Sequence, residues 1–133
     1  MVKYLKQYQI LYNKAKTDLT AAKILLYQFK NSDAELDLEI IFFHLQQCVE
    51  KLLKATLSKN EIYFPKTHDL EQLFNLIDVN IIDLVTNRKL LMKLNYYAVE
   101  GRYAVIHDDL DKADKYILEL TILTDKVSLL LHD

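Results

Sequence analysis

The sequence contains very little glycine, proline or cysteine. Its 133 residues include one Gly, one Pro, one Cys and no Trp. One glycine cannot build the Gly-rich loops that hold phosphates in dinucleotide-binding or nucleoside-triphosphate-binding proteins, so those two classes are excluded. A lone cysteine excludes a disulfide framework and a thiolate zinc cluster, and this fits a protein of the reducing cytoplasm.

Motifs for metal binding and for nucleophilic catalysis are also missing. The four histidines, at positions 44, 68, 107 and 132, form no pair at i, i+3 or i+4 spacing. Neither an HExxH motif nor a calcium-binding loop occurs. No GxSxG turn is present, and Cys48 is interpreted as a small buried hydrophobe on a helix. We therefore expect no metal and no cofactor.

Apolar residues dominate the sequence that remains. They make up 51% of the chain, against 27% charged residues. A chain of this length buries enough surface for one core, so we predict a single helical domain over residues 1–133. Because no Asn-Gly or Asp-Gly hairpin signal occurs, we expect no sheet. The predicted fold class is all-α, an up-and-down bundle of four to five helices.

Charge is spread unevenly along the chain. Residues 1–30 hold six Lys and one Asp, a local charge of +5, which leaves −7 on the remainder of a chain whose net charge is −2. The whole-chain charge therefore does not predict nucleic-acid binding, although a basic face can exist locally. The N-terminal stretch has no apolar run of signal-peptide or membrane-spanning length. We expect a soluble, cytoplasmic protein with no membrane partner.

Apolar residues at steps of three and four predict the helices. The first covers about 3–29 and stops at Asn31-Ser32-Asp33, and the second ends near 59–60. A connector follows, in which His68 is interpreted as ordering the chain, and Thr67 or Asp69 can cap the next helix. The remaining helices are expected at about 69–77, 86–103 and 109–131. In the second helix, an apolar stripe lies opposite a polar stripe formed by His44, Gln47, Lys51 and Lys54.

The stretch NYYAVEGRYAVIHDDL, residues 95–110, contains the only glycine, together with Arg102 and His107. Arginine presents a planar fork of donors that suits a phosphate, and histidine titrates near neutral pH. Together they can cleave RNA without a metal, with an acid and a base moving protons and Arg stabilising the charge at phosphorus. The alternative is that both residues lie at the solvated end of a structural helix.

Helix geometry limits how Arg102 and His107 can cooperate. In an unbroken helix, five positions would turn His107 by about 140° and shift it by about 7.5 Å along the axis. The helix must therefore end or bend between them, or the cleft must combine Arg from one chain with His from another. A homodimer joined through the end of the fourth helix would place two of each residue in one cleft. Apolar side chains left without internal partners also predict self-association.

Three segments, FFHLQQCVEKLLKATL, FPKTHDLEQL and YYAVEGRY, resemble the HEPN domain family in the right order and over nearly the whole chain. The resemblance implies a compact helical bundle, usually dimeric and often encoded beside a small nucleotidyltransferase with which it forms a toxin-antitoxin pair. Many members are metal-independent endoribonucleases whose signature is an Arg, four to six residues, then a His. Arg102 and His107 fill these two places.

Two functions follow from the resemblance. The first is a metal-independent endoribonuclease, the toxin of a HEPN/nucleotidyltransferase pair, in which Arg102 holds the scissile phosphate of RNA and His107 transfers protons at a dimer cleft. The second is a non-catalytic module that docks a nucleotidyltransferase partner or binds a nucleotide. GRYAV resembles a branch that keeps an Arg-Tyr pair and often lacks the His. Asp109 stands where nucleotide-silenced toxins carry the modified tyrosine.

Four further residues are candidates for contacts with RNA or a nucleotide. They are Tyr103, Lys51, Lys54 and His44. A tyrosine ring can stack on a base, and Lys and His can contact phosphate. The alternative for these side chains is a place in the core, on the solvated surface or at a subunit interface.

Overall fold

The computed structural model describes residues 5–32, 38–77, 87–98 and 110–132. Within these ranges the chain forms five α-helices and one 3₁₀ helix, with no strand. They are α1 (Gln7–Asn31), α2 (Leu38–Lys59), α3 (Leu70–Leu76), α4 (Arg88–Met92), the 3₁₀ helix η1 (Lys93–Ala98) and α5 (Leu110–Leu131). The all-α prediction is confirmed. None of the described helices combines the length and the apolar composition that crossing a membrane requires.

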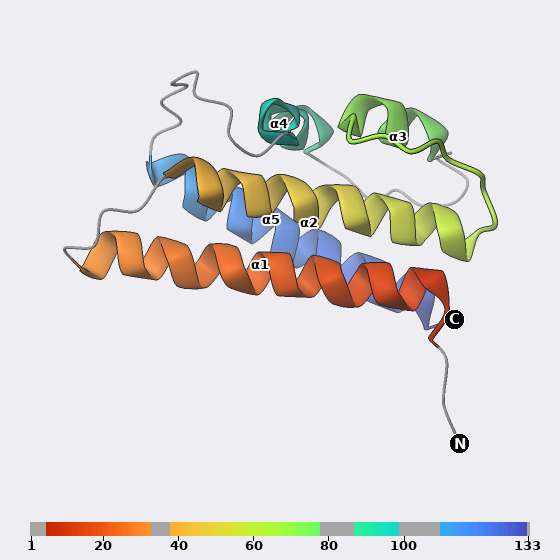
Figure 1. Ribbon diagram of the computed structural model, residues 1–133, viewed down its shortest axis with the longest axis horizontal. Helices are drawn as coiled ribbons and strands as arrows, with labels where there is room; N and C mark the ends of the chain where they lie inside the picture. Colours follow the sequence, from red (N-terminus) through yellow and green to blue (C-terminus); the bar gives the residue numbers. More distant parts are fainter. Residues whose placement is uncertain (1–4, 33–37, 78–86, 99–109, 133) are drawn as a thin grey trace.

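The three long helices lie alongside one another, and α2 runs between α1 and the short helices α3 and α4 (Figure 1). Ser58 near the end of α2 donates a hydrogen bond to Gln7 at the start of α1, so these two helices are antiparallel. Lys30 at the end of α1 pairs with Asp114 near the start of α5, over 2.6 Å. Helix α1 is therefore antiparallel to both of its long neighbours.

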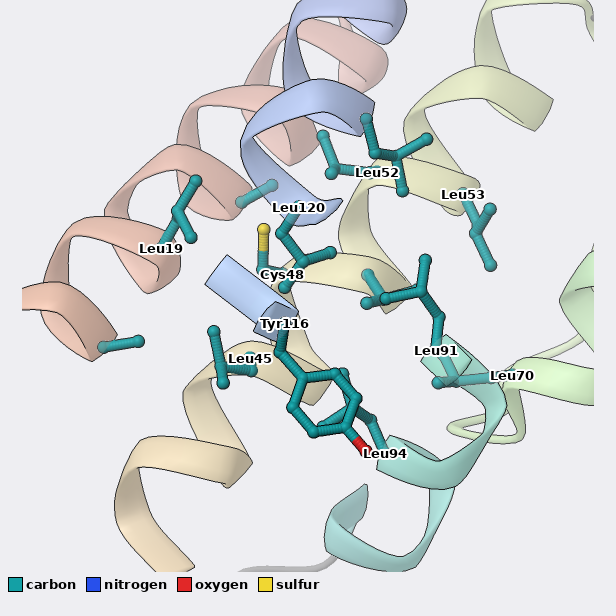
Figure 2. Packing of buried hydrophobic residues seen from close by; sticks show 14 of the residues in the cluster. Leu19, Leu45, Cys48, Leu52, Leu53, Leu70, Leu91, Leu94, Tyr116 and Leu120 are labelled. Atoms are coloured by element: carbon teal, nitrogen blue, oxygen red, sulfur yellow. The ribbon is translucent and has the colours of Figure 1, made fainter. Parts of the chain in front are cut away.

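Helix α2 is the central helix of the core. The predicted apolar stripe is buried, and so are residues outside it, including Gln46, Cys48, Ala55 and Leu57. Leu45, Cys48 and Leu52 of α2 meet Leu19 of α1 and Leu120 of α5 in a single cluster (Figure 2). Neighbouring elements cover α2 on several sides. Between residues 44 and 54, only a narrow strip of its surface stays partly open, formed by His44, Gln47, Lys51 and Lys54.

The observed helix ends follow the capping chemistry of the sequence. Helix α1 begins at Gln7 rather than near Lys3, because Lys6 has an extended backbone and its amide donates to Gln9 Oε1. Asp69 caps α3 by accepting a hydrogen bond from the Glu71 amide over 3.0 Å. Thr67, the other predicted cap, instead accepts from the Asp69 amide and shapes the turn before the helix.

The predicted fourth helix over 86–103 requires a correction. Helix α4 covers only Arg88–Met92, and the chain then tightens into the 3₁₀ helix Lys93–Ala98. Residues three apart lie on the same side of a 3₁₀ helix, and Leu94 and Tyr97 are both buried there. Packing of these two side chains accounts for the tighter winding. Positions 99–103 of the predicted helix lie outside the described residues.

Candidate functional site

The predicted site residues fall into two groups. Arg102, His107 and Tyr103 lie outside the residues that the structure describes. His44, Lys51 and Lys54 lie on the partly open strip of α2. The first two of these face α1, and Lys54 lies 6.0 Å from the ring centroid of Phe64 in the connector before α3.

Asp18 of α1 binds both of the strip residues that face it. Its Oδ1 lies 2.9 Å from His44 Nδ1, and Lys51 Nζ donates to its Oδ2 over 2.5 Å. Asp18 is only 8% exposed. A carboxylate this buried is stable when cations or donors satisfy its oxygens, and here both oxygens have such a partner. The cluster ties α1 to α2 near their middles.

Glu50 forms a second cluster on the other side of the strip. Lys54 Nζ, one turn further along α2, lies 3.2 Å from Glu50 Oε2, and His68 Nδ1 lies 2.9 Å from Oε1. Gln46 Nε2 donates to the backbone oxygen of His68 over 3.2 Å. The connector is therefore held against α2 through both the side chain and the backbone of His68, which agrees with the ordering role predicted for this residue.

Both clusters combine one buried carboxylate, one Lys and one His. The side chains of Lys51 and Lys54 are 21% and 14% exposed, and their ammonium groups neutralise Asp18 and Glu50. In His44 and His68 the Nδ1 atom faces the carboxylate, which leaves Nε2 as the ring atom that can contact a group outside the cluster. In the described part of the chain, no three His, Cys, Asp or Glu side chains are grouped to hold a metal ion.

One aromatic residue, Phe42, contacts described residues that precede and follow the positions of Arg102 and His107 in the chain. Tyr97, before these positions, stacks on Phe42 with ring centroids 5.1 Å apart. Tyr116, after them, meets Phe42 edge-on, with centroids 5.8 Å apart. Phe42 is 1% exposed. The buried face of α2 therefore positions the chain on each side of the predicted catalytic pair.

Cys48 is a core residue, as predicted. It is fully buried, and burial raises the pKa of its thiol to about 12, with a further contribution from the negative charge of Asp18. A thiol acts as a nucleophile in its deprotonated form. Cys48 is therefore protonated at neutral pH and unsuited to nucleophilic catalysis.

Asp18 lies in none of the segments that sequence reasoning connected with function. Two signals point to it in retrospect. It is the sole acidic residue among the first 30, and it lies in register with Ala15 and Ala22 on the buried side of α1. An acid in an apolar register requires a cationic partner. Its partners, His44 and Lys51, come from another helix and could not be identified from spacing along the chain.

Comparison with known proteins gives one match. A family model described as HEPN domain matches residues 8–127. The matched range contains α2, α3, α4, η1 and most of α1 and α5, and it also contains positions 102 and 107. No curated protein and no solved structure matches the chain.

Proposed function

The chain belongs to the HEPN domain family, a family of ribonuclease-type modules, and from this premise we propose that it is a metal-independent endoribonuclease. The observation that carries the proposal is the family match across residues 8–127, which includes an Arg and a His at the spacing of the HEPN nuclease signature. Arg102 and His107 are the proposed catalytic residues.

The proposed reaction is an internal transfer at phosphorus. A base takes the proton of the ribose 2′-hydroxyl, and the oxygen attacks the adjacent phosphodiester. The bond from phosphorus to the 5′-oxygen breaks, an acid protonates the departing oxygen, and a 2′,3′-cyclic phosphate remains. Arg102 stabilises the negative charge that gathers on the phosphoryl oxygens, and His107 gives or takes a proton. No step requires a metal ion.

Two protons move in this reaction, and one His cannot hold both roles at once. We propose a two-fold dimer in which the region around Arg102 and His107 meets its mate, so that one cleft contains two Arg and two His. The requirement for two proton-transferring groups supports this proposal, since each chain has one His near Arg102.

Substrate binding is proposed for four other residues. Tyr103 would stack on a base, and His44, Lys51 and Lys54 would contact the RNA backbone. The ammonium groups of the two lysines already bind Asp18 and Glu50, so RNA phosphates would have to share them with these carboxylates. His44 has more freedom, because only its Nδ1 atom is engaged with Asp18.

A second function is a non-catalytic module that docks a nucleotidyltransferase or binds a nucleotide. The internal ion pairs favour it, because Lys51 and Lys54 each neutralise a buried carboxylate and so present little free positive charge to RNA. The Arg-Tyr pair at positions 102 and 103 would then form part of the contact surface. For the nuclease, the biological setting that we propose is a toxin-antitoxin pair with a nucleotidyltransferase.

The experiment is cleavage of a mixed RNA by purified protein in EDTA. Arg102→Ala and His107→Ala are the test variants, and Arg88→Ala and His132→Ala are matched controls that remove the other Arg and a His from the C-terminal end of α5. We expect 2′,3′-cyclic ends from the wild type and both controls, and intact RNA with both test variants. Intact RNA with the wild type, in a folded protein, would contradict the nuclease. Cleavage that survives His107→Ala would contradict the assignment of that residue.

A further inference from the structure

The outward surface of α5 has an unusual regularity. From position 115 onward, the exposed residues are Lys115, Leu118, Ile122, Asp125 and Leu129 of α5, followed by His132 just after the helix, and every residue between them is buried or half-buried. The steps alternate between three and four. This is the spacing of the a and d positions at which two helices pack in a coiled coil. We call these six residues the outer seam.

Three of the six residues of the outer seam have large aliphatic side chains. Leu118, Ile122 and Leu129 are 60%, 42% and 74% exposed. The opposite side of α5 is already used, since Tyr116, Leu120 and Val127 are buried in the bundle core. Three large aliphatic side chains in helical register, left in water, indicate an interaction surface rather than scattered surface residues.

We propose that the outer seam binds the outer seam of a second copy of this chain, with the two α5 helices antiparallel about a two-fold axis. In the proposed register, Leu118 of each copy lies level with Ile122 of the other. A two-fold axis makes the contact self-complementary, so each such layer occurs twice. Leu129 then extends over the first turn of the second copy's α5.

The charges of the outer seam select this arrangement. In the register that places Leu118 beside Ile122 of the second copy, Lys115 lies beside Asp125 of the second copy. Opposite charges therefore meet at both ends of the apolar layers. A parallel pairing would instead place Asp125 against Asp125 and Lys115 against Lys115. An antiparallel pairing shifted by seven residues would place Asp125 against Ile122. The parallel pairing sets like charges together, and the shifted pairing places Lys115 level with His132 instead of an acidic residue. Of the three arrangements, the proposed one alone brings Lys115 and Asp125 together.

Helix α1 can widen the contact on one side. The ion pair between Lys30 and Asp114 places the end of α1 beside the start of α5. Tyr27 and Ile24 precede Lys30 by about one and two turns and are 65% and 57% exposed. Because α1 and α5 are antiparallel, Tyr27 and Ile24 lie about level with the stretch of α5 that contains Leu118, where their apolar surface can add to the area that two copies bury.

This interface is distinct from the dimer cleft of the proposed nuclease. In the antiparallel register, the two copies of Leu110 lie 20 helical positions apart, which is about 30 Å along the axis. Leu110 is the first residue of α5, so the starts of the two paired helices lie at opposite ends of the contact. The outer seam does not rest on the nuclease proposal. Charge reversal at Lys115 and Asp125 changes the outer seam and leaves Arg102 and His107 unaltered, so it separates this interface from the dimer cleft.

Sedimentation equilibrium of charge-reversed variants tests the interface. We expect Lys115→Glu and Asp125→Lys each to weaken self-association by about tenfold, and the double variant to restore it, because the ion pair is then reversed rather than broken. Lys14→Glu, at an exposed position of α1, is the matched control and should associate like the wild type. A wild type that stays monomeric up to about 100 µM would overturn the proposal. Association unchanged in both single variants would overturn it too.

Cysteine cross-linking tests the register separately from any other contact. A mixture of Lys115→Cys and Asp125→Cys chains should form a disulfide between copies, since these positions lie level. Lys115→Cys alone should not, because its two copies would lie about 15 Å apart along the helices. The natural thiol, Cys48, is buried and does not compete. Equal cross-linking in the mixture and in each variant alone would contradict the antiparallel register.

Discussion

Two aspartates of this protein show how burial decides what a charged side chain contributes to the stability of the fold. Asp18 and Asp114 each pair with a lysine, but the side chain of Asp18 is 11% exposed and that of Asp114 is 61% exposed. Water screens the exposed pair, whereas the buried carboxylate depends on its protein partners. An aspartate therefore contributes differently to the free energy of unfolding at the two positions.

Comparison of Asp18→Asn with Asp114→Asn measures this difference. Both changes remove a charge and keep the size of the side chain. We expect Asp18→Asn to lower the free energy of unfolding by about 2–4 kcal/mol, because Lys51 and His44 lose the group that they neutralise. Asp114→Asn should cost about 0–1 kcal/mol. Urea denaturation gives both values, and equal losses would contradict the role assigned to Asp18.

The thiol of Cys48 makes stability depend on pH in the alkaline range. Burial raises its pKa from 9.0 to about 12, so the unfolded chain loses this proton at a lower pH than the folded chain does. The neutral thiol therefore makes its full contribution to the free energy of unfolding below about pH 9, and this contribution declines as the pH rises toward 12. The free-energy difference between wild type and Cys48→Ala should shrink by about 1 kcal/mol from pH 7 to pH 10. A difference that stays constant would contradict this.

At the scale of secondary structure, the short elements depend on long-range contacts. Asn95 of η1 accepts a hydrogen bond from the Leu70 amide at the start of α3 and donates to Asp69 Oδ1, each over 2.9 Å. Asn87, next to α4, donates to Glu119 of α5 over 2.7 Å. Isolated helices of five to seven residues are not stable in water, so these contacts and the core determine that α3, α4 and η1 form.

The stacking of Tyr97 on Phe42 is the contact that links η1 to the middle of the bundle. A double-mutant cycle with Phe42→Leu and Tyr97→Leu should give a coupling of about 0.5–1.5 kcal/mol, the range for aromatic pairs beyond simple burial. Tyr27→Leu is the matched control, since this exposed ring should not couple to Phe42. Strictly additive losses for Phe42 and Tyr97 in urea denaturation would show that the two rings do not stabilise each other.

At the scale of the whole molecule, α2 joins every other element to one core. Its buried residues belong to the same apolar cluster as residues from α1, α3, α4, η1 and α5. Among the described helices, each one that loses its contacts would expose part of α2. The single domain predicted over residues 1–133 should therefore unfold as one unit.

Coincidence of two signals tests the single domain. Helix content followed by far-UV circular dichroism and the environment of the nine tyrosines followed by near-UV absorption should give the same midpoint in urea. The first signal reports mostly on the long helices, and the second reports on packing around rings such as Tyr97 and Tyr116. Separate midpoints would mean that α3, α4 and η1 unfold apart from the long helices.

Several features were predictable because they depend on neighbours in the chain. The three- and four-residue apolar steps located the long helices, and Asn31-Ser32 marked the end of the first. Asp69 was recognisable as a cap, since its side chain reaches an amide two residues away. The candidate pair Arg102 and His107 was likewise found from type and spacing, and its catalytic role stays a prediction.

The amino-acid sequence is enough to assign the class of this protein: an all-α domain with one core, a family signature and a candidate pair of catalytic residues. The pairing of Asp18 with Lys51, the pairing of His68 with Glu50 and the tightening of the chain to a 3₁₀ helix at Lys93 became known from the packed helices. The physical reason is range. Helix propensity and capping act over a few residues, whereas ion pairs and core packing join residues far apart, and their partners exist only once the helices have come together.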